Sequence, residues 1–168
     1  MNLVAGTTGV EQTRALAGAL SGLARAGDLV LLAGELGAGK TAFAQGFAAG
    51  LGVDEVVTSP TFTLVRTYPG GRLRMNHVDV YRLEHLQEVI DLGLAEMVDD
   101  PAVTLIEWGD AVVPALPADF LEVRLAYGDQ AGDHRSLCLR TLGPAWAARE
   151  RALGAVLAPW APARGPAC

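Results

Sequence analysis

Lysine is almost absent from this chain, because Lys40 is the only lysine among 13 basic residues and the others are arginine. Positive charge is also in short supply, since 19 acidic residues give a net charge of −6. Proteins that grip nucleic acid neutralise its phosphates with clustered lysine and arginine. The charge balance therefore argues against direct binding of DNA or RNA, and a partner is expected to hold any RNA involved.

Long apolar runs and a charged signal-peptide start are missing as well. The chain has two cysteines, which show no metal-ligand spacing and are too few for a disulfide framework. Cys138 alternates with apolar neighbours, so we expect it in the core, and we expect Cys168, the last residue, to have no role. These features favour a cytoplasmic protein that does not associate with membranes.

The length of 168 residues, with 51% hydrophobic and 19% charged residues, suits one well-buried domain. We expect this domain to span residues 1–157. Residues 158–168 are rich in alanine and proline, which predicts a tail without fixed structure.

The single lysine lies in a glycine-rich segment, GELGAGKT, that fits the phosphate-binding pattern G-x-x-x-x-G-K-[ST]. An apolar run at residues 29–33 precedes it and apolar residues at helical spacing follow it, so the segment should join a strand to a helix. Thr41 is expected to give its hydroxyl to Mg²⁺. The predicted nucleotide-binding residues are Gly34, Glu35, Leu36, Gly37, Ala38, Gly39, Lys40, Thr41 and Ala42.

Lysine suits this position for a physical reason. Its ammonium group is a compact charge on a thin stem that can follow the loop to the phosphates, whereas a planar guanidinium would crowd that space. Glycines allow the backbone to turn its N–H groups toward an anion, and the start of the helix adds partial positive charge.

Strands and helices alternate along the rest of the chain. Pro69-Gly70-Gly71 separates two strand-like runs, which predicts a hairpin, and residues 120–127 and 135–142 should form a late antiparallel pair. Helices are expected over residues 85–98, with a break at Gly93, and over 145–157. The predicted fold is a three-layer α/β P-loop NTPase sandwich whose mainly parallel sheet has antiparallel additions.

Two acids follow strand-like runs, Asp79 in HVDVYR and Glu107 in VTLIEW. Ligands bind at the carboxyl ends of strands in such sheets, so both acids are candidate catalytic residues and Glu107 is the better match to a Mg²⁺-managing acid. Trp108, next to Glu107, is a candidate for nucleotide contact or for simple packing. His77, two residues before Asp79, is expected to be structural more often than catalytic.

The segment TSPTF lies a short distance beyond the predicted phosphate-binding helix. A threonine there has the reach of a switch residue toward a γ-phosphate and Mg²⁺, and the alternative is an ordinary turn. The candidate switch residues are Ser59, Pro60, Thr61 and Phe62.

Other phosphate-loop proteins fit less well. A guanine-reading Asn-Lys-x-Asp motif needs a second lysine, which excludes a standard GTPase. An AAA+ motor needs a larger module than 168 residues. A stand-alone small-molecule kinase remains the alternative, although no arginine-rich lid insertion is visible.

Together, GELGAGKT, VTSPTFTLV, HVDVYRL, DLGL and LIEW resemble the TsaE family in order and spacing, over about Leu3 to Leu142. That resemblance implies an ATP- and Mg²⁺-dependent ATPase needed for threonylcarbamoyl modification of tRNA. It also implies that the protein acts on a complex of TsaD and TsaB, with TsaD carrying out the transfer, and meets tRNA only through that complex.

The resemblance also assigns roles to residues. It makes Asp79 and Glu107 the essential acids and Trp108 a required neighbour in the nucleotide site. Residues 59–62 become the switch-like loop, and Thr41 and Glu107 the expected metal ligands.

Overall fold

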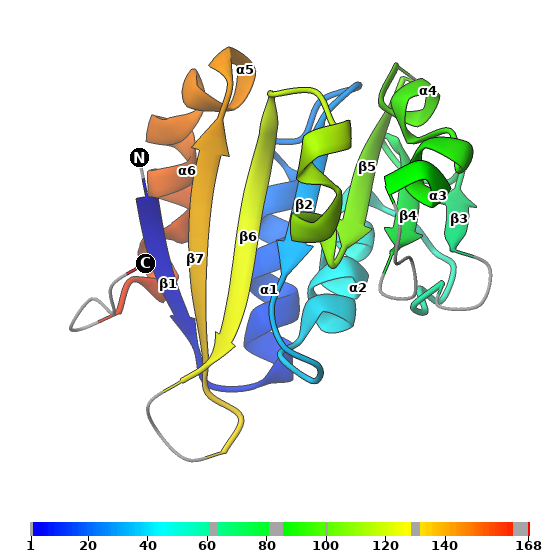
Figure 1. The fold of residues 1–168 in the computed structure, drawn as a ribbon. Helices are drawn as coiled ribbons and strands as arrows, with labels where there is room; N and C mark the ends of the chain where they lie inside the picture. The colour runs from blue at the N-terminus through cyan, green and yellow to red at the C-terminus, as the bar shows by residue number, and fades with distance from the viewer. Residues whose placement is uncertain (1, 61–63, 81–85, 100, 129–131, 163–167) are drawn as a thin grey trace.

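The computed structural model describes residues 2–60, 64–80, 86–99, 101–128, 132–162 and 168. Seven strands form one sheet in the order β1-β7-β6-β2-β5-β4-β3 (Figure 1). The inner strands β6, β2, β5 and β4 run parallel, and antiparallel pairs lie at both edges. The strands are β1 (Asn2–Thr7), β2 (Leu29–Ala33), β3 (Val65–Tyr68), β4 (Arg74–Asp79), β5 (Ala102–Glu107), β6 (Phe120–Tyr127) and β7 (Arg135–Leu142).

The predicted α/β class is confirmed, as are both predicted antiparallel pairs, β3 with β4 and β6 with β7. The sheet is more mixed than expected, because β1 adds a further antiparallel strand beside β7. The predicted strand over residues 29–33 is β2, and the helix that follows it is α2.

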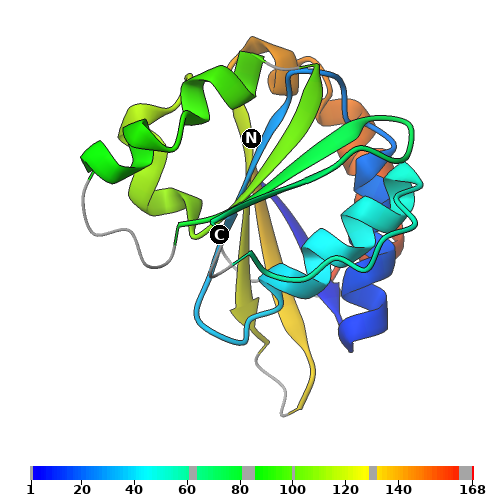
Figure 2. The same ribbon diagram turned by 90° about the vertical axis from the view of Figure 1, so that its right-hand side faces the viewer.

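Helices cover both faces of the sheet, so the molecule has three layers (Figure 2). One face packs against α1 (Val10–Ser21), α2 (Lys40–Leu51), α5 (Pro144–Ala147) and α6 (Glu150–Leu157). The other face lies under α3 (Leu86–Asp91), α4 (Leu94–Asp99) and the 3₁₀ helix η1 (Gly109–Ala115). Among the helices described, none has the length and apolarity needed to cross a bilayer.

Strand β2 shows why the central strands carry continuous apolar runs. All five of its residues are buried. Val30 and Leu32 pack with the α1 and α2 side chains, whereas Leu29 and Leu31 pack with Leu94 and its neighbours on the other face. A strand covered on both faces needs apolar residues at every position, which is typical of parallel sheets.

A buried ion pair fixes the C-terminal helices to the sheet. The Arg149 guanidinium contacts the Asp28 carboxylate through two bonds of 2.6 and 2.8 Å, and both side chains are less than a tenth exposed. The same guanidinium donates to the Leu23 carbonyl and stacks on the Trp146 ring at 3.8 Å. Asp28 also accepts the Arg25 N–H, so each buried charge is paired and has additional hydrogen bonds.

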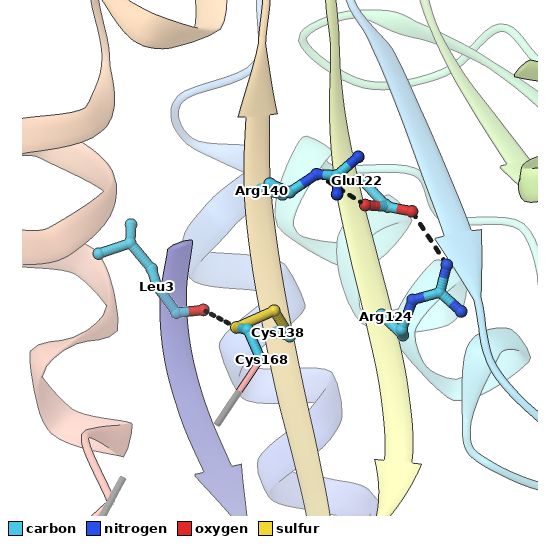
Figure 3. Close-up of a disulfide and its surroundings, with 6 residues drawn as sticks. All are labelled: Leu3, Glu122, Arg124, Cys138, Arg140 and Cys168. Carbon is cyan, nitrogen blue, oxygen red and sulfur yellow. Dashed lines mark hydrogen bonds and ion pairs between the residues drawn. A yellow bond between two sulfur atoms is a disulfide. The ribbon is translucent and has the colours of Figure 1, made fainter. Parts of the chain in front are cut away.

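The expectation for the cysteines is wrong. Cys138 and Cys168 form a disulfide on the face of β7 that lies opposite α6 (Figure 3). Among the described residues, no helix covers this face over β1 and most of β7 (Figure 1). Alternation along β7 therefore places Leu137 and Leu139 in the core and Cys138 outside it, where the end of the chain reaches it.

The end of the chain also differs from the expected unstructured tail. Residues Ala158–Trp160 form the 3₁₀ helix η2, and Trp160 packs against the main core. The Cys168 Sγ lies 3.9 Å from the carbonyl oxygen of Leu3 on β1. Within this alanine- and proline-rich segment, the Trp160 side chain and the disulfide-bonded Cys168 supply contacts that the overall composition does not indicate.

The ion pair generates a stability prediction. Asp28→Asn keeps the side-chain volume but leaves the buried Arg149 charge unpaired, so the free energy of unfolding should fall by about 3 kcal/mol. Urea denaturation measures it. The matched control is Glu122→Gln, which breaks the contacts to the half-exposed Arg124 and Arg140 and should cost less than about 1 kcal/mol. Equal losses of unfolding free energy in the two variants would contradict the stabilising role of the Asp28–Arg149 pair.

Candidate functional site

Parallel pairing brings the two predicted acids together at the carboxyl ends of two neighbouring strands. Asp79 ends β4 and lies opposite Glu107, which ends β5, and Glu107 in turn lies opposite Leu32 of β2. Both carboxylates are buried. The loop that follows β2 leaves the sheet at this same end of the strands, so the acids and the loop share one site.

The phosphate loop, residues 34–41, has the backbone that its glycines predict. Gly34, Gly37 and Gly39 have φ values of 142°, 80° and 108°, which side-chain-bearing residues rarely adopt. Helix α2 begins at Lys40, directly after the last of these glycines. The N–H groups at the start of a helix have no carbonyl partner within that helix, so those of the first turn of α2 lie beside the loop and favour an anion there.

The Lys40 side chain lies back along the phosphate loop. Its Nζ donates to the carbonyl oxygens of Gly34 at 2.7 Å and Glu35 at 2.9 Å, and it lies 3.6 Å from the centre of the Trp108 ring. Trp108 has a φ of 64° and donates its backbone N–H to the Leu32 carbonyl at 2.7 Å. Such a strained residue is typical of functional sites, and here it turns the indole ring over the ammonium group.

Glu107 links the loop to a buried histidine. Its carboxylate accepts the Thr41 hydroxyl at 3.3 and 3.4 Å, and its Oε1 lies 2.8 Å from Nε2 of the fully buried His77. His77 therefore touches the acid from behind and does not line the cavity in front of it. A hydroxyl and a carboxylate are the hard oxygen donors that Mg²⁺ prefers, so Thr41 and Glu107 fit that ion.

Asp79 connects the site to the candidate switch segment. Its Oδ2 accepts the Ser59 hydroxyl at 2.8 Å. The Pro60 carbonyl accepts the Leu64 N–H at 2.6 Å, and the Leu64 carbonyl accepts the Asp79 N–H. Thr61 and Phe62 lie outside the described residues. The two acids thus have different neighbours, Thr41 and His77 for Glu107 and Ser59 for Asp79.

A cavity of about 350 Å³ lies in front of these groups. Every residue that lines it belongs to the set predicted from the sequence: Leu36, Gly37, Gly39, Lys40, Thr41, Ala42, Ser59, Asp79, Glu107 and Trp108. A second hollow of about 200 Å³ lies beside the first turn of α2, lined by Val10, Thr13, Gly37, Gly39, Ala42, Asp133 and Arg135. Its residues from α1 and from the β6–β7 hairpin were not predicted.

Sequence reasoning also missed two side chains that contact the phosphate loop from outside. The Tyr127 hydroxyl donates to the Leu36 carbonyl at 3.0 Å. Arg135 donates through Nε to the Ala38 carbonyl at 3.2 Å and through Nη2 to the Gly37 carbonyl at 3.4 Å. Both residues lie more than 90 positions from the loop residues that they contact, and no local pattern marks them.

Comparison with known proteins is consistent across sequence and structure. Residues 7–137 match the family described as Threonylcarbamoyl adenosine biosynthesis protein TsaE. A Streptomyces coelicolor protein named tRNA threonylcarbamoyladenosine biosynthesis protein TsaE is 45% identical over 139 residues, 80% of this chain and 93% of that protein. The Bacillus subtilis protein of the same name is 42% identical over 127 residues, which cover 76% of this chain and 77% of that protein.

A solved structure has the same fold. The crystal structure of Bacillus subtilis YdiB aligns with a TM-score of 0.80 and 32% identity, covering 92% of this chain and 95% of that one. The similarity therefore extends over nearly the whole sheet and its helices.

The contact between Lys40 and Trp108 generates a spectroscopic prediction. A polyphosphate such as ATP should draw the ammonium group toward its own oxygens, which removes a cation from the indole ring and changes tryptophan fluorescence. Trp108→Phe should abolish most of this change, because Trp146 and Trp160 lie in the C-terminal segment, away from the cavity lining. An undiminished signal in that variant would show that another tryptophan responds.

Proposed function

Because this chain belongs to the TsaE family of threonylcarbamoyl adenosine biosynthesis proteins, we propose that it is an ATPase required for forming threonylcarbamoyladenosine in tRNA. One observation carries the ATPase assignment. The phosphate loop, Lys40 and two buried acids meet at the carboxyl ends of the neighbouring strands β2, β5 and β4. We propose that it acts on a complex of TsaD and TsaB proteins and does not carry out the transfer itself.

The phosphate loop supplies the contacts for the triphosphate of ATP. Backbone N–H groups of the glycine-rich turn and of the first turn of α2 face an anion, and Lys40 adds a charge-assisted bond. ATP is favoured over GTP because Lys40, the only lysine, already serves the phosphates.

The two acids have different proposed roles. Thr41 and Glu107 would hold Mg²⁺, which supplies charge neutralisation at the phosphates when it is bound. Glu107 orients a water for attack on the terminal phosphate, and the His77 contact holds its carboxylate in one orientation. Asp79 holds Ser59 and so couples the site to the switch-like segment at residues 59–62.

Dependence on partners follows from the charges in the cavity. Among the described residues that line the 350 Å³ cavity, Lys40 is the only cation and none is arginine. These described residues then neutralise only part of the charge that develops on the transferred phosphoryl group. The net charge of −6 further favours contact with tRNA through the partner complex. A cytoplasmic location is proposed with it, because that is where a tRNA-modification protein would act.

We also infer that residues 1–157 act as a single ATPase domain. The strands that carry the phosphate loop and the acids pack in the same sheet as β1 and β7, and α6 ends at Leu157. Trp160 and Cys168 then attach the following segment to this domain, by packing against its core and by the disulfide to β7. A stand-alone small-molecule kinase is the competing function, and it would transfer phosphate to an acceptor instead of water.

Glu107→Gln tests the chemical role of the acid. The variant keeps the shape of the side chain but loses its charge, so ATP should still bind through the phosphate loop and Lys40. Turnover should fall by at least ~10²-fold, the usual scale for a positioned acid–base group. Equilibrium ATP binding and steady-state phosphate release measure the two effects separately.

Asp79→Asn serves as the matched control for that variant. Because Asp79 contacts Ser59 and not Thr41, its loss should weaken stimulation by TsaD–TsaB at least as much as basal hydrolysis. Normal turnover in Glu107→Gln together with an inactive Asp79→Asn would show that the two roles are reversed.

Partner stimulation tests the proposed function as a whole. ATP hydrolysis by the isolated protein should be slow and should rise when purified TsaD and TsaB are added, since arginines supplied by a partner are worth roughly 10³–10⁵ in rate in other phosphate-loop proteins. Phosphate release with and without the partners measures this rise. Equal rates, or transfer of phosphate to a small-molecule acceptor, would favour the kinase alternative.

A further inference from the structure

Every backbone carbonyl of the phosphate loop from residue 34 to residue 38 accepts a hydrogen bond. Lys40 Nζ supplies the bonds to the Gly34 and Glu35 oxygens, and the Ala38 N–H also donates to the Glu35 oxygen. The three remaining carbonyls, at Leu36, Gly37 and Ala38, are bonded by side chains of the β6–β7 hairpin. This matters because a loop that binds phosphate must turn its N–H groups inward and its carbonyls outward.

The hairpin contacts come from two side chains that also hold each other. The Arg135 guanidinium lies 4.6 Å from the centre of the Tyr127 ring, at the distance of a cation–π contact. Arg135 Nη1 donates to the carbonyl of His134 at 2.9 Å, so the guanidinium is fixed to its own strand as well as to the loop. A β-carbon added at Gly37 would come within 2.7 Å of the Tyr127 hydroxyl, which shows how closely the loop approaches this side chain.

We propose that Tyr127 and Arg135 are positioning residues that hold the phosphate loop in its anion-binding conformation. They act on the outer side of the loop, through the carbonyl groups of Leu36, Gly37 and Ala38, and their bonds do not involve its N–H groups. This inference rests on the proposed ATPase function, which uses that loop to bind the triphosphate of ATP.

The two residues differ in role from Lys40. Phosphate oxygens are stronger acceptors for an ammonium group than carbonyls, so bound ATP should draw Lys40 away from the Gly34 and Glu35 oxygens. The bonds from Tyr127 and Arg135 compete with no ligand atom, because their acceptors point away from the anion-binding side. They therefore maintain the loop both before and after nucleotide binding.

Their contribution should appear in affinity and leave the chemical step nearly unchanged. Neither residue lines the 350 Å³ cavity that contains Thr41, Asp79 and Glu107. A loop that is less well organised has to be ordered when the ligand binds, which weakens binding by the free energy of that ordering. The variants should accordingly raise KM and leave kcat within about twofold of the parent.

The test compares ATP with inorganic triphosphate, which has the phosphates but no nucleoside. Tyr127→Phe removes only the hydroxyl donor and should weaken both ligands by the same factor, roughly 2- to 10-fold. Arg135→Gln removes a charged donor and should weaken both by about tenfold or more. Arg140→Gln is the control, since this residue is exposed on the same strand and contacts Glu122 instead of the loop. Calorimetric titration of each variant in Mg²⁺ gives the affinities.

The outcomes separate the possible roles. Equal weakening of ATP and triphosphate, with normal binding in Arg140→Gln, supports the proposal. Weakened ATP with unchanged triphosphate overturns it, because the residues would then contact the nucleoside. Unchanged binding of both ligands overturns this inference alone, whereas a parent protein that binds neither ligand overturns the proposed function with it. Tyr127 is half exposed at 51%, so its hydroxyl can be removed without disturbing the core.

Discussion

Parallel pairing of β2 with β5 and of β5 with β4 is the constraint on which the candidate site depends. It sets Leu32, Glu107 and Asp79 side by side where the three strands end. A shift of one residue between β4 and β5 would turn the alternate side chains to the other face of the sheet and separate His77 from Glu107. The buried apolar runs on both faces of these strands oppose such a shift, so the packing of the core also fixes the geometry of the acids.

Much of the fold could be predicted because its signals are local. The apolar run before the phosphate loop, the turn residues between β3 and β4, and the predicted break at Gly93 between α3 and α4 each depend on a few neighbouring residues. Strand β1 was not predicted, since Asn2–Thr7 mixes small, polar and apolar residues and is paired on one side only, with β7 far along the chain. Cys138 was misplaced because alternation predicts two faces without saying which face a helix covers.

In the candidate site, too, the residues with local sequence signals could be predicted and those that depend on long-range contacts could not. The phosphate loop and the acids were predicted because glycine spacing and strand ends have a direct physical meaning in the sequence. Tyr127 and Arg135 were not, because their contacts with Leu36 and Ala38 depend on where a distant hairpin lies. The His77 contact with Glu107 was also missed, since it depends on the register between β4 and β5. Long-range register is the information that a single sequence gives least clearly.

The disulfide between Cys138 and Cys168 closes the last part of the chain into a ring that contains α5 and α6. The two cysteines are 30 positions apart, and in the chain-entropy view closing a ring of that size removes freedom from the unfolded chain equivalent to about 3 to 4 kcal/mol. Stability would then depend on the thiol–disulfide balance of the surroundings as well as on temperature and denaturant. Reducing compartments keep most thiols free. In such a compartment the C-terminal segment of the same sequence would therefore unfold locally at a lower free-energy cost than in an oxidising solution.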